Sequence, residues 1–154
     1  MEMHAPEQIT PRGLADYLEV LTKVVFQSGI SWRVVEAKWP DIQAALHRFD
    51  PGWLADLTPD DLDMLAQDRR VIRNRRKLQA ISENAGQMLD LEEAHGSFQA
   101  YLRSHANFDE TVADLRKKFR FVGEHGAYYF LHVVGEHVPD YGSWCAAHRG
   151  GHAG

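Results

Sequence analysis

The sequence predicts an all-α fold, a single compact helical domain spanning residues 1–154. Apolar residues recur mostly at spacings of three and four, the period of an amphipathic helix. No segment alternates convincingly between apolar and polar residues, and helix-capping residues recur between the apolar stretches. A chain of 154 residues is long enough for one core. We expect that core over about residues 10–146, with a frayed polar N-terminus and a frayed glycine-rich C-terminal tail.

Two helices are expected in the first third of the chain. The first carries its apolar face over residues 14–25, and Thr10-Pro11 offers an N-cap followed by a proline suited to the first helical turn. The second begins near Ser31. Because Pro40 lacks a backbone N–H, we expect it to interrupt this helix and to open a further short one.

The remaining helices are placed by their capping residues. Thr58 is followed three residues later by an acid, the pattern of a capping box. A long helix is expected from about Asn74 to Gly96, since glycine readily adopts the left-handed conformation that ends helices. Gly123 or Gly126 separates the last two expected helices. Shorter elements start at Asp50-Pro51, at Ser97, and at Asp109 or Thr111.

The composition excludes several classes of protein. No apolar run approaches the ~20 residues needed to span a bilayer. The N-terminus lacks the basic and apolar regions of a signal peptide, so we expect a cytoplasmic protein without a membrane contact. Cys145 is the single cysteine, which excludes an internal disulfide and a multi-cysteine zinc cluster. His137, Cys145, His148 and His152 match no standard zinc spacing, so we expect neither a metal nor a cofactor.

Positive charge is concentrated in two segments of an otherwise acidic chain. The net charge is −5, yet ten of the 17 lysines and arginines fall within Arg69–Lys77 and Arg116–Arg120. If these segments meet in space, they form one positive face compatible with a modest, salt-sensitive contact to nucleic acid. The alternative is two unrelated solvated helix faces.

The segment from Arg116 to Gly135 joins the second basic run to an apolar, aromatic helix through a turn at Gly123. A glycine turn between two helices exposes backbone N–H groups where a phosphate can bind, and the nearby cations attract nucleic acid without regard to sequence. The pattern is typical of a helix–hairpin–helix contact with DNA. A plain helical corner with a solvated basic face remains the alternative.

Three ordered motifs carry a resemblance to a known family. Phe26-Gln-Ser-Gly-Ile-Ser-Trp32 is similar to its Gln-Ala-Gly-Leu-Ser-Trp, and Phe119-Arg-Phe-Val-Gly123, followed by Tyr128 and Gly135, to its Phe-Lys-Phe-Val-Gly…Tyr…Gly. Between them, residues 71–85 are similar to its Ile-Ile-Arg-His-Arg-Gly-Lys-Ile-Gln-Ala-Ile…Asn-Ala. From about residue 14 to residue 140, the chain resembles the DNA-3-methyladenine glycosylase I family, within the helix–hairpin–helix DNA glycosylase superfamily.

The resemblance implies a base excision repair enzyme, a monomer that works on double-stranded DNA, cytoplasmic and associated with the nucleoid of a bacterium. A base inside a duplex cannot be reached, so such an enzyme flips the damaged base into a pocket and hydrolyses its N-glycosidic bond. N3-alkylation makes adenine cationic and a good leaving group. The site then needs stacking aromatics and a dry pocket more than a strong general acid.

The resemblance also implies roles for individual residues. Trp32 would stack on the flipped base. Val24 and Tyr128 would line its pocket, and Gln27 and Gly29 would enter the duplex. Each has a structural alternative, namely core packing for the aromatic residues and an ordinary helix end for the loop. The residues expected to hold phosphates are Lys118, Arg120 and Gly123, assisted by Arg73, Arg76 and Lys77.

The chain departs from the family where chemistry is concerned. Val24 stands where the family has a carboxylate eight residues before its tryptophan, so substrate choice or activity on 3-methyladenine should change. The N-terminal motif and the zinc ligands of the family are absent. Asp140 follows the hairpin about where the wider superfamily has its catalytic aspartate, and its alternative role is an N-cap after Pro139; Glu136 is a less favoured candidate.

Catalysis and its absence remain distinct hypotheses. No lysine occupies the hairpin after Gly123, so we expect a monofunctional reaction without a Schiff base. The alternative is a non-catalytic helix–hairpin–helix DNA-binding module derived from a glycosylase, and a third reading is a helical interaction domain that no longer binds DNA. The identity of the excised base is left open.

Overall fold

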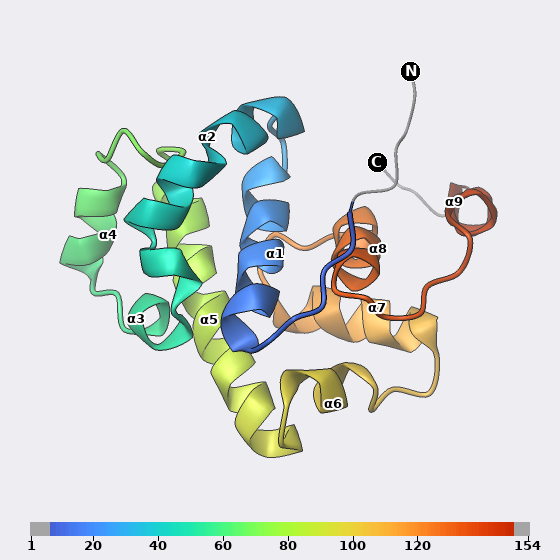
Figure 1. Ribbon diagram of the computed structural model, residues 1–154. Coiled ribbons are helices and arrows are strands. Elements are labelled where there is room, and N and C mark those ends of the chain that lie inside the picture. Colours follow the sequence, from blue (N-terminus) through green and yellow to red (C-terminus); the bar gives the residue numbers. More distant parts are fainter. Residues whose placement is uncertain (1–6, 150–154) are drawn as a thin grey trace.

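The computed structural model describes residues 7–149, and within them the chain forms helices and no strand, as predicted (Figure 1). The expected fraying of the N-terminus and the tail concerns mainly residues outside this range. The helices are α1 (Leu14–Gln27), α2 (Trp32–Ala45), the 3₁₀ turn η1 (His47–Phe49), α3 (Pro51–Ala55), α4 (Pro59–Leu65), α5 (Arg75–His95), α6 (Phe98–Leu102), α7 (Phe108–Lys118), α8 (Glu124–Val133) and α9 (Tyr141–Arg149).

Helix α1 is the centre of the molecule. It packs against α5, α8 and α2, and Figure 1 shows it between the α2–α5 group and the α7–α9 group. Leu18, Leu21 and Val25 are fully buried at the spacing of three and four that predicted this helix. A helix that contacts both halves of the molecule fixes the relative position of any site that draws residues from both.

The start of α1 differs from the sequence prediction. The helix begins after Gly13, not at Thr10-Pro11. The backbone N–H of Ile9 donates to the carbonyl of Val133 at 2.8 Å, which ties the residues before α1 to the end of α8. The Asp16 carboxylate accepts from the backbone N–H of Arg12 at 2.8 Å, so an acid in the first turn satisfies a donor that precedes the helix.

Helix α2 continues through Pro40, where an interruption was predicted. A proline inside a helix frees the carbonyl of the residue four positions earlier, here Glu36. Both Glu36 and Pro40 lie on the exposed face of α2, where water can satisfy that carbonyl. The opposite face buries Val35, Trp39 and Ile42, and this packing outweighs the lost hydrogen bond.

Most capping predictions are confirmed. Asp50 and Ser97 cap α3 and α6, and Thr58 forms a capping box with Asp61. Asn74 caps α5, which ends at Gly96 with a φ of 89°. At the two ambiguous positions, α7 is capped by Asn107 and not by Asp109 or Thr111, and Gly123, not Gly126, precedes α8. No helix within residues 7–149 is long and apolar enough to cross a membrane.

Candidate nucleic-acid interface and base pocket

The turn between α7 and α8 is anchored from α5. Asn84 is buried, and its side-chain amide accepts from the backbone N–H of Arg120 at 2.8 Å and donates to the carbonyl of the same residue at 3.2 Å. The amide therefore pairs with Arg120 much as a neighbouring peptide group would. Phe121 follows with a φ of 60°, a left-handed conformation that is uncommon for a bulky residue and persists when the surroundings enforce it.

The two basic segments meet at this turn. The Arg76 guanidinium lies over the ring of Phe121, 5.9 Å from its centre, and Arg120 forms an ion pair with Glu83 of α5 at 3.0 Å. Gly123 is the N-cap of α8 and has no side chain to cover the first N–H groups of that helix. The two basic segments therefore touch at Arg76 and Phe121, although Arg120 is paired with Glu83.

The expected insertion loop links α1 to α2 over residues 28–31. Gly29 has a φ of 77°, a conformation that glycine adopts at no steric cost, and Ser31 caps α2. Lys77 of α5 supports this loop from below, because its ammonium donates to the carbonyl of Phe26 at 3.2 Å and to that of Ser28. Gln27, the last residue of α1, is half-buried, whereas Gly29 is exposed.

Lys77 is the one predicted phosphate contact that the structure moves into the interior. Its exposed fraction is 5 %, and burial lowers the pKa of its ammonium. Two carbonyls at the end of α1 hold the charge, where the partial negative charge of a helix C-terminus favours a cation. The Lys77 ammonium therefore holds the end of α1 and the residue after it, and it is not exposed where a phosphate could reach it.

Lys118 faces α6. Its ammonium donates to both Asp114 oxygens at 3.0 Å and lies 5.5 Å from the centre of the Tyr101 ring. The Asp114 carboxylate also accepts from the Tyr101 hydroxyl at 2.7 Å and contacts His105 Nε2 at 2.9 Å. Burial by itself would raise the pKa of Asp114, but hydrogen bonds to His105, Tyr101 and Lys118 outweigh it and hold that pKa at about 2.

Trp32 lies at the exposed start of α2, directly after the insertion loop. It is 54 % exposed, and Val34, two residues further on, is 49 % exposed. Core packing, the structural alternative for Trp32, is therefore not what the structure shows. A flat aromatic face open to solvent beside a loop is available to stack on a base.

Val24 is buried in the contact between α1 and α8. It is 6 % exposed, and a Cβ added to Gly126 would lie 2.7 Å from its Cγ1, closer than two carbon atoms can approach. A Cβ at this point of α8 would force Val24 or the helix to shift. The position where the family resemblance implies a carboxylate is thus occupied by an aliphatic side chain packed against a neighbouring helix.

Tyr128 points away from Val24. It is two residues beyond Gly126, so its side chain leaves α8 about 200° around the helix axis. Its hydroxyl donates to the carbonyl of Pro139 at 2.5 Å, and its ring packs against Trp144 with 4.7 Å between ring centres. Burial and the charge of Asp140 raise the pKa of Tyr128. The structure does not bring Tyr128 and Val24 into one pocket.

The next residue, Tyr129, leaves α8 about 100° around the helix axis from Tyr128. Burial, together with the negative charge of Glu36 on α2, raises the pKa of Tyr129. Glu36 is one helical turn beyond Trp32 and pairs with Lys23 at 2.5 Å. Tyr129 is therefore the tyrosine of α8 that lies toward the Trp32 end of α2.

Asp140 caps α9. One of its oxygens, Oδ2, accepts from the backbone N–H of Ser143 at 3.0 Å and contacts the hydroxyl of the same residue at 3.2 Å. Its backbone carbonyl accepts from the N–H of Trp144 at 2.9 Å. Asp140 therefore has the N-cap role that was the alternative to a catalytic one.

Glu136, the less favoured catalytic candidate, pairs with Arg103 at 3.1 Å. No cluster of metal-ligating side chains occurs within the described part of the chain.

Comparison with known proteins decides the family. The family model described as methyladenine glycosylase matches residues 11–118, more than half of the chain. This chain belongs to the methyladenine glycosylase family. It is 30% identical to the DNA-3-methyladenine glycosylase of Haemophilus influenzae over 138 residues, 74% of this chain and 75% of the relative. It is likewise 30% identical to DNA-3-methyladenine glycosylase 1 of Escherichia coli, covering 80% of this chain and 77% of that one.

Solved structures of the methyladenine glycosylase family share the fold. A 3-methyladenine DNA glycosylase I from Staphylococcus aureus superposes with a TM-score of 0.73 at 24% identity, covering 84% of this chain and 80% of that one. A solution structure of 3-methyladenine DNA glycosylase I gives 0.69 at 28% identity, covering 85% and 79%. The predicted all-α glycosylase fold is therefore confirmed.

The sequence of this methyladenine glycosylase family member does not reveal the structural role of Asn84, which holds the turn at Arg120. Asn84 lies within the second motif, and that membership is the signal that points to it. A buried amide in a helix needs partners, yet its partner is the backbone of a residue 36 positions away, which no local pattern encodes. The left-handed Phe121 is invisible in the sequence for the same reason.

Proposed function

We propose that this protein is a monofunctional DNA glycosylase that flips an alkylated, 3-methyladenine-like purine out of duplex DNA and hydrolyses its N-glycosidic bond. Membership of the methyladenine glycosylase family supports this function. The observation that carries it is the placement of exposed Trp32 beside the insertion loop, which α5 joins to the hairpin through Lys77 and Asn84. Base contact and backbone contact then occur on one side of one chain, so a monomer suffices.

The substrate class follows from the chemistry of this arrangement. An alkylated purine carries a positive charge and attracts an aromatic face such as that of Trp32. With Val24 in the α1–α8 contact, no carboxylate at that position reads the base edge, so stacking supplies a larger share of recognition. A relative solved in complex with 3-methyladenine belongs to the same structural group, and we extend that class of base to this chain.

Hydrolysis needs a water and a stabilised sugar cation, and no nucleophilic lysine follows Gly123. We propose Asp140 as the carboxylate that orients the water, although the hydrogen bond of Tyr128 to Pro139 puts its segment on the side of α8 away from Val24. Its Oδ2 is engaged by Ser143, and its Oδ1 accepts no hydrogen bond within residues 7–149. The side chain is exposed, and one oxygen can cap α9 while the other meets solvent. We place the activity on double-stranded DNA in a bacterial nucleoid.

Base release from methylated duplex DNA tests this function. We expect wild type to release 3-methyladenine, and Trp32→Ala to lower the rate by about 5- to 150-fold, the loss of one base-stacking contact. Trp32→Phe keeps an aromatic face and should keep most of the rate. Trp53→Ala is the matched control, since Trp53 stacks on His47 at a ring distance of 3.6 Å on α3. Chromatography of the released base gives the rates.

A second candidate function has one observation in its favour. Val24 packs closely against Gly126 at the position where the family resemblance implies a carboxylate, and a non-catalytic DNA-binding module would not need that carboxylate. Wild-type protein that binds duplex DNA and releases no base would select this module. Strand cleavage with a borohydride-trapped adduct would instead contradict the monofunctional reaction.

A further inference from the structure

The first basic segment is less uniform than its sequence indicates. Arg70 pairs with Asp68 at 2.8 Å, Arg75 pairs with Asp63 at 2.6 Å, and Lys77 is buried. Three of its six cations are therefore neutralised by acids or placed in the interior. The remaining three are Arg69, Arg73 and Arg76. All three are exposed, and none pairs with a carboxylate of residues 7–149.

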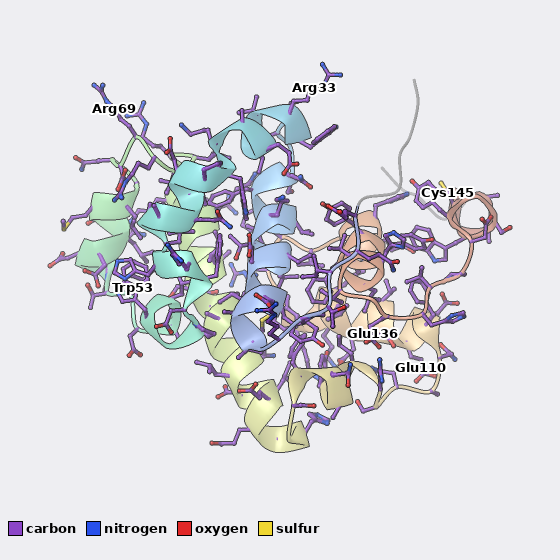
Figure 2. All side chains as sticks on the ribbon, in the orientation of Figure 1. Arg33, Trp53, Arg69, Glu110, Glu136 and Cys145 are labelled. Atoms are coloured by element: carbon purple, nitrogen blue, oxygen red, sulfur yellow. The ribbon has the colours of Figure 1, made fainter. Side chains whose placement is uncertain are left out.

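Arg69 belongs to the α4–α5 connection, and this connection is held against α2. The Lys38 ammonium of α2 donates to the backbone carbonyl of Arg69 at 2.9 Å, which fixes the backbone and leaves the guanidinium free to point outward. On α2 itself, Arg33 follows Trp32 and is exposed, and it too has no carboxylate partner in the described part of the chain. Figure 2 shows Arg33 and Arg69 projecting outward on the same side of the molecule.

Side-chain contacts of α5 connect this side of the molecule to the proposed DNA interface. Lys77 joins the start of α5 to the insertion loop, and Arg76 joins it to the hairpin. Trp32 and Arg33 follow the insertion loop directly along the chain. The insertion loop therefore adjoins the hairpin through α5 and continues along the chain into Arg33 of α2. Glu110 and Glu136, in contrast, lie in the lower right part of Figure 2, away from both arginines.

We infer that Arg33 and Arg69 bind phosphates of duplex DNA beyond the insertion loop, in addition to those held at the hairpin. This inference rests on the proposed function and extends its interface from α5 across α2. Arginine suits the task because its fork donates to phosphate oxygens and it cannot lose its charge. The two residues would position the duplex without reading its sequence, so they hold the DNA while the loop and Trp32 engage the base.

The test measures how salt changes the affinity for a fluorescein-labelled, undamaged 20-base-pair duplex. Each phosphate contact that is lost makes the plot of log K against log [KCl] less steep by about 0.9. We expect Arg33→Gln and Arg69→Gln each to reduce the slope by about that amount, and the double variant by about twice as much. Arg33→Lys should keep the wild-type slope, because it keeps the charge. Anisotropy titrations between low and moderate salt supply the affinities.

Arg103→Gln is the matched control. It removes the same single charge from an exposed arginine that pairs with Glu136 at 3.1 Å on the far side of the molecule, and we expect an unchanged slope. If Arg73→Gln and Arg76→Gln reduce the slope and Arg33→Gln and Arg69→Gln do not, the inference is wrong and the proposed function stands. If wild type shows no salt-dependent binding, both fail. Equal effects of Arg103→Gln and Arg33→Gln would also overturn the inference, because only net charge would then matter.

Discussion

At the scale of the residue, Gly126 sets how closely α1 and α8 approach. Its missing Cβ is the space that Val24 fills, and a branched side chain such as valine has little rotational freedom with which to yield. The contact is buried, so a clash there cannot be relieved into solvent. The valine that stands where the family resemblance implies a carboxylate is therefore matched by a glycine on the facing helix, which leaves room for it.

We predict that Gly126→Ala lowers the free energy of unfolding by about 1–3 kcal/mol, the usual range for overpacking. Urea unfolding followed by circular dichroism measures it. The double variant Gly126→Ala with Val24→Ala should recover part of the loss. Gly86→Ala is the control, since a Cβ there meets nothing within 4 Å and should stabilise α5 by about 0.5–1 kcal/mol. Equal effects at both glycines would contradict the clash.

At the scale of the element, Asp114 joins α7 to α6. Its carboxylate accepts hydrogen bonds from Tyr101 of α6 and Lys118 of its own helix, and it contacts His105 of the α6–α7 connection. A surface cavity of about 450 Å³ lies beside this cluster and is lined by residues of both helices. The ionised carboxylate is the common acceptor, so these contacts depend on its charge.

We predict that acid weakens the α6–α7 contact. The folded pKa of Asp114 is about 2, below the value of ~3.9 for an unfolded chain, so its stabilisation is complete above about pH 4. It disappears as the pH falls from about 4 to 2. In Asp114→Asn, the unfolding midpoint in urea should fall less steeply with acid over this range than in wild type. Asp90→Asn, an exposed position on α5, should follow wild type; parallel curves for all three proteins would exclude the effect.

At the scale of the whole molecule, α9 is attached differently from the rest. The main core runs through α1, α5 and α8, whereas Trp144 of α9 packs in a separate aromatic group with Tyr128 and Phe108. Figure 1 shows α9 at the outer edge. A helix held by one aromatic group has fewer buried contacts to lose when it opens.

We predict that α9 opens before the core unfolds. Native-state hydrogen exchange should give the amide of Trp144 a lower opening free energy than amides in the middle of α5, which should exchange only by global unfolding. Trp144→Ala should remove the remaining protection in α9 and leave that of α5 nearly unchanged. Identical opening free energies in α9 and α5 would show a single cooperative unit instead.

The fold was predictable because local signals agree with the packing. Thr58, Asn74 and Gly96 each mark a helix end in the sequence and in the structure. The predicted helix break at Pro40 was wrong because burial of the opposite face of α2 overrides the local preference of proline. The predicted start of α1 at Thr10-Pro11 was wrong because the preceding residues are held by a hydrogen bond from Ile9 to Val133. The sequence does not reveal such a long-range contact.

The sequence predicted the residue types of the candidate site but not how their side chains are buried or oriented. The basic hairpin follows from residue types, whereas the exposure of Trp32 and the burial of Lys77 do not, since tryptophans are mostly buried and lysines mostly lie in water. The divergence of Tyr128 and Val24 depends on which side of α8 meets α1. That orientation is decided by packing over the whole molecule.

Lys77 and Asn84 stand seven residues apart on α5, about two helical turns, so both leave the same side of one helix. Lys77 hydrogen-bonds to the end of α1 before the insertion loop, and Asn84 hydrogen-bonds to the hairpin at Arg120. The distance between the loop that we propose to enter the duplex and the hairpin that we propose to hold its backbone is therefore set by the rise of a single helix before DNA binds. Little ordering is left to occur on association, and a substitution that bends α5 would misalign both contacts at once.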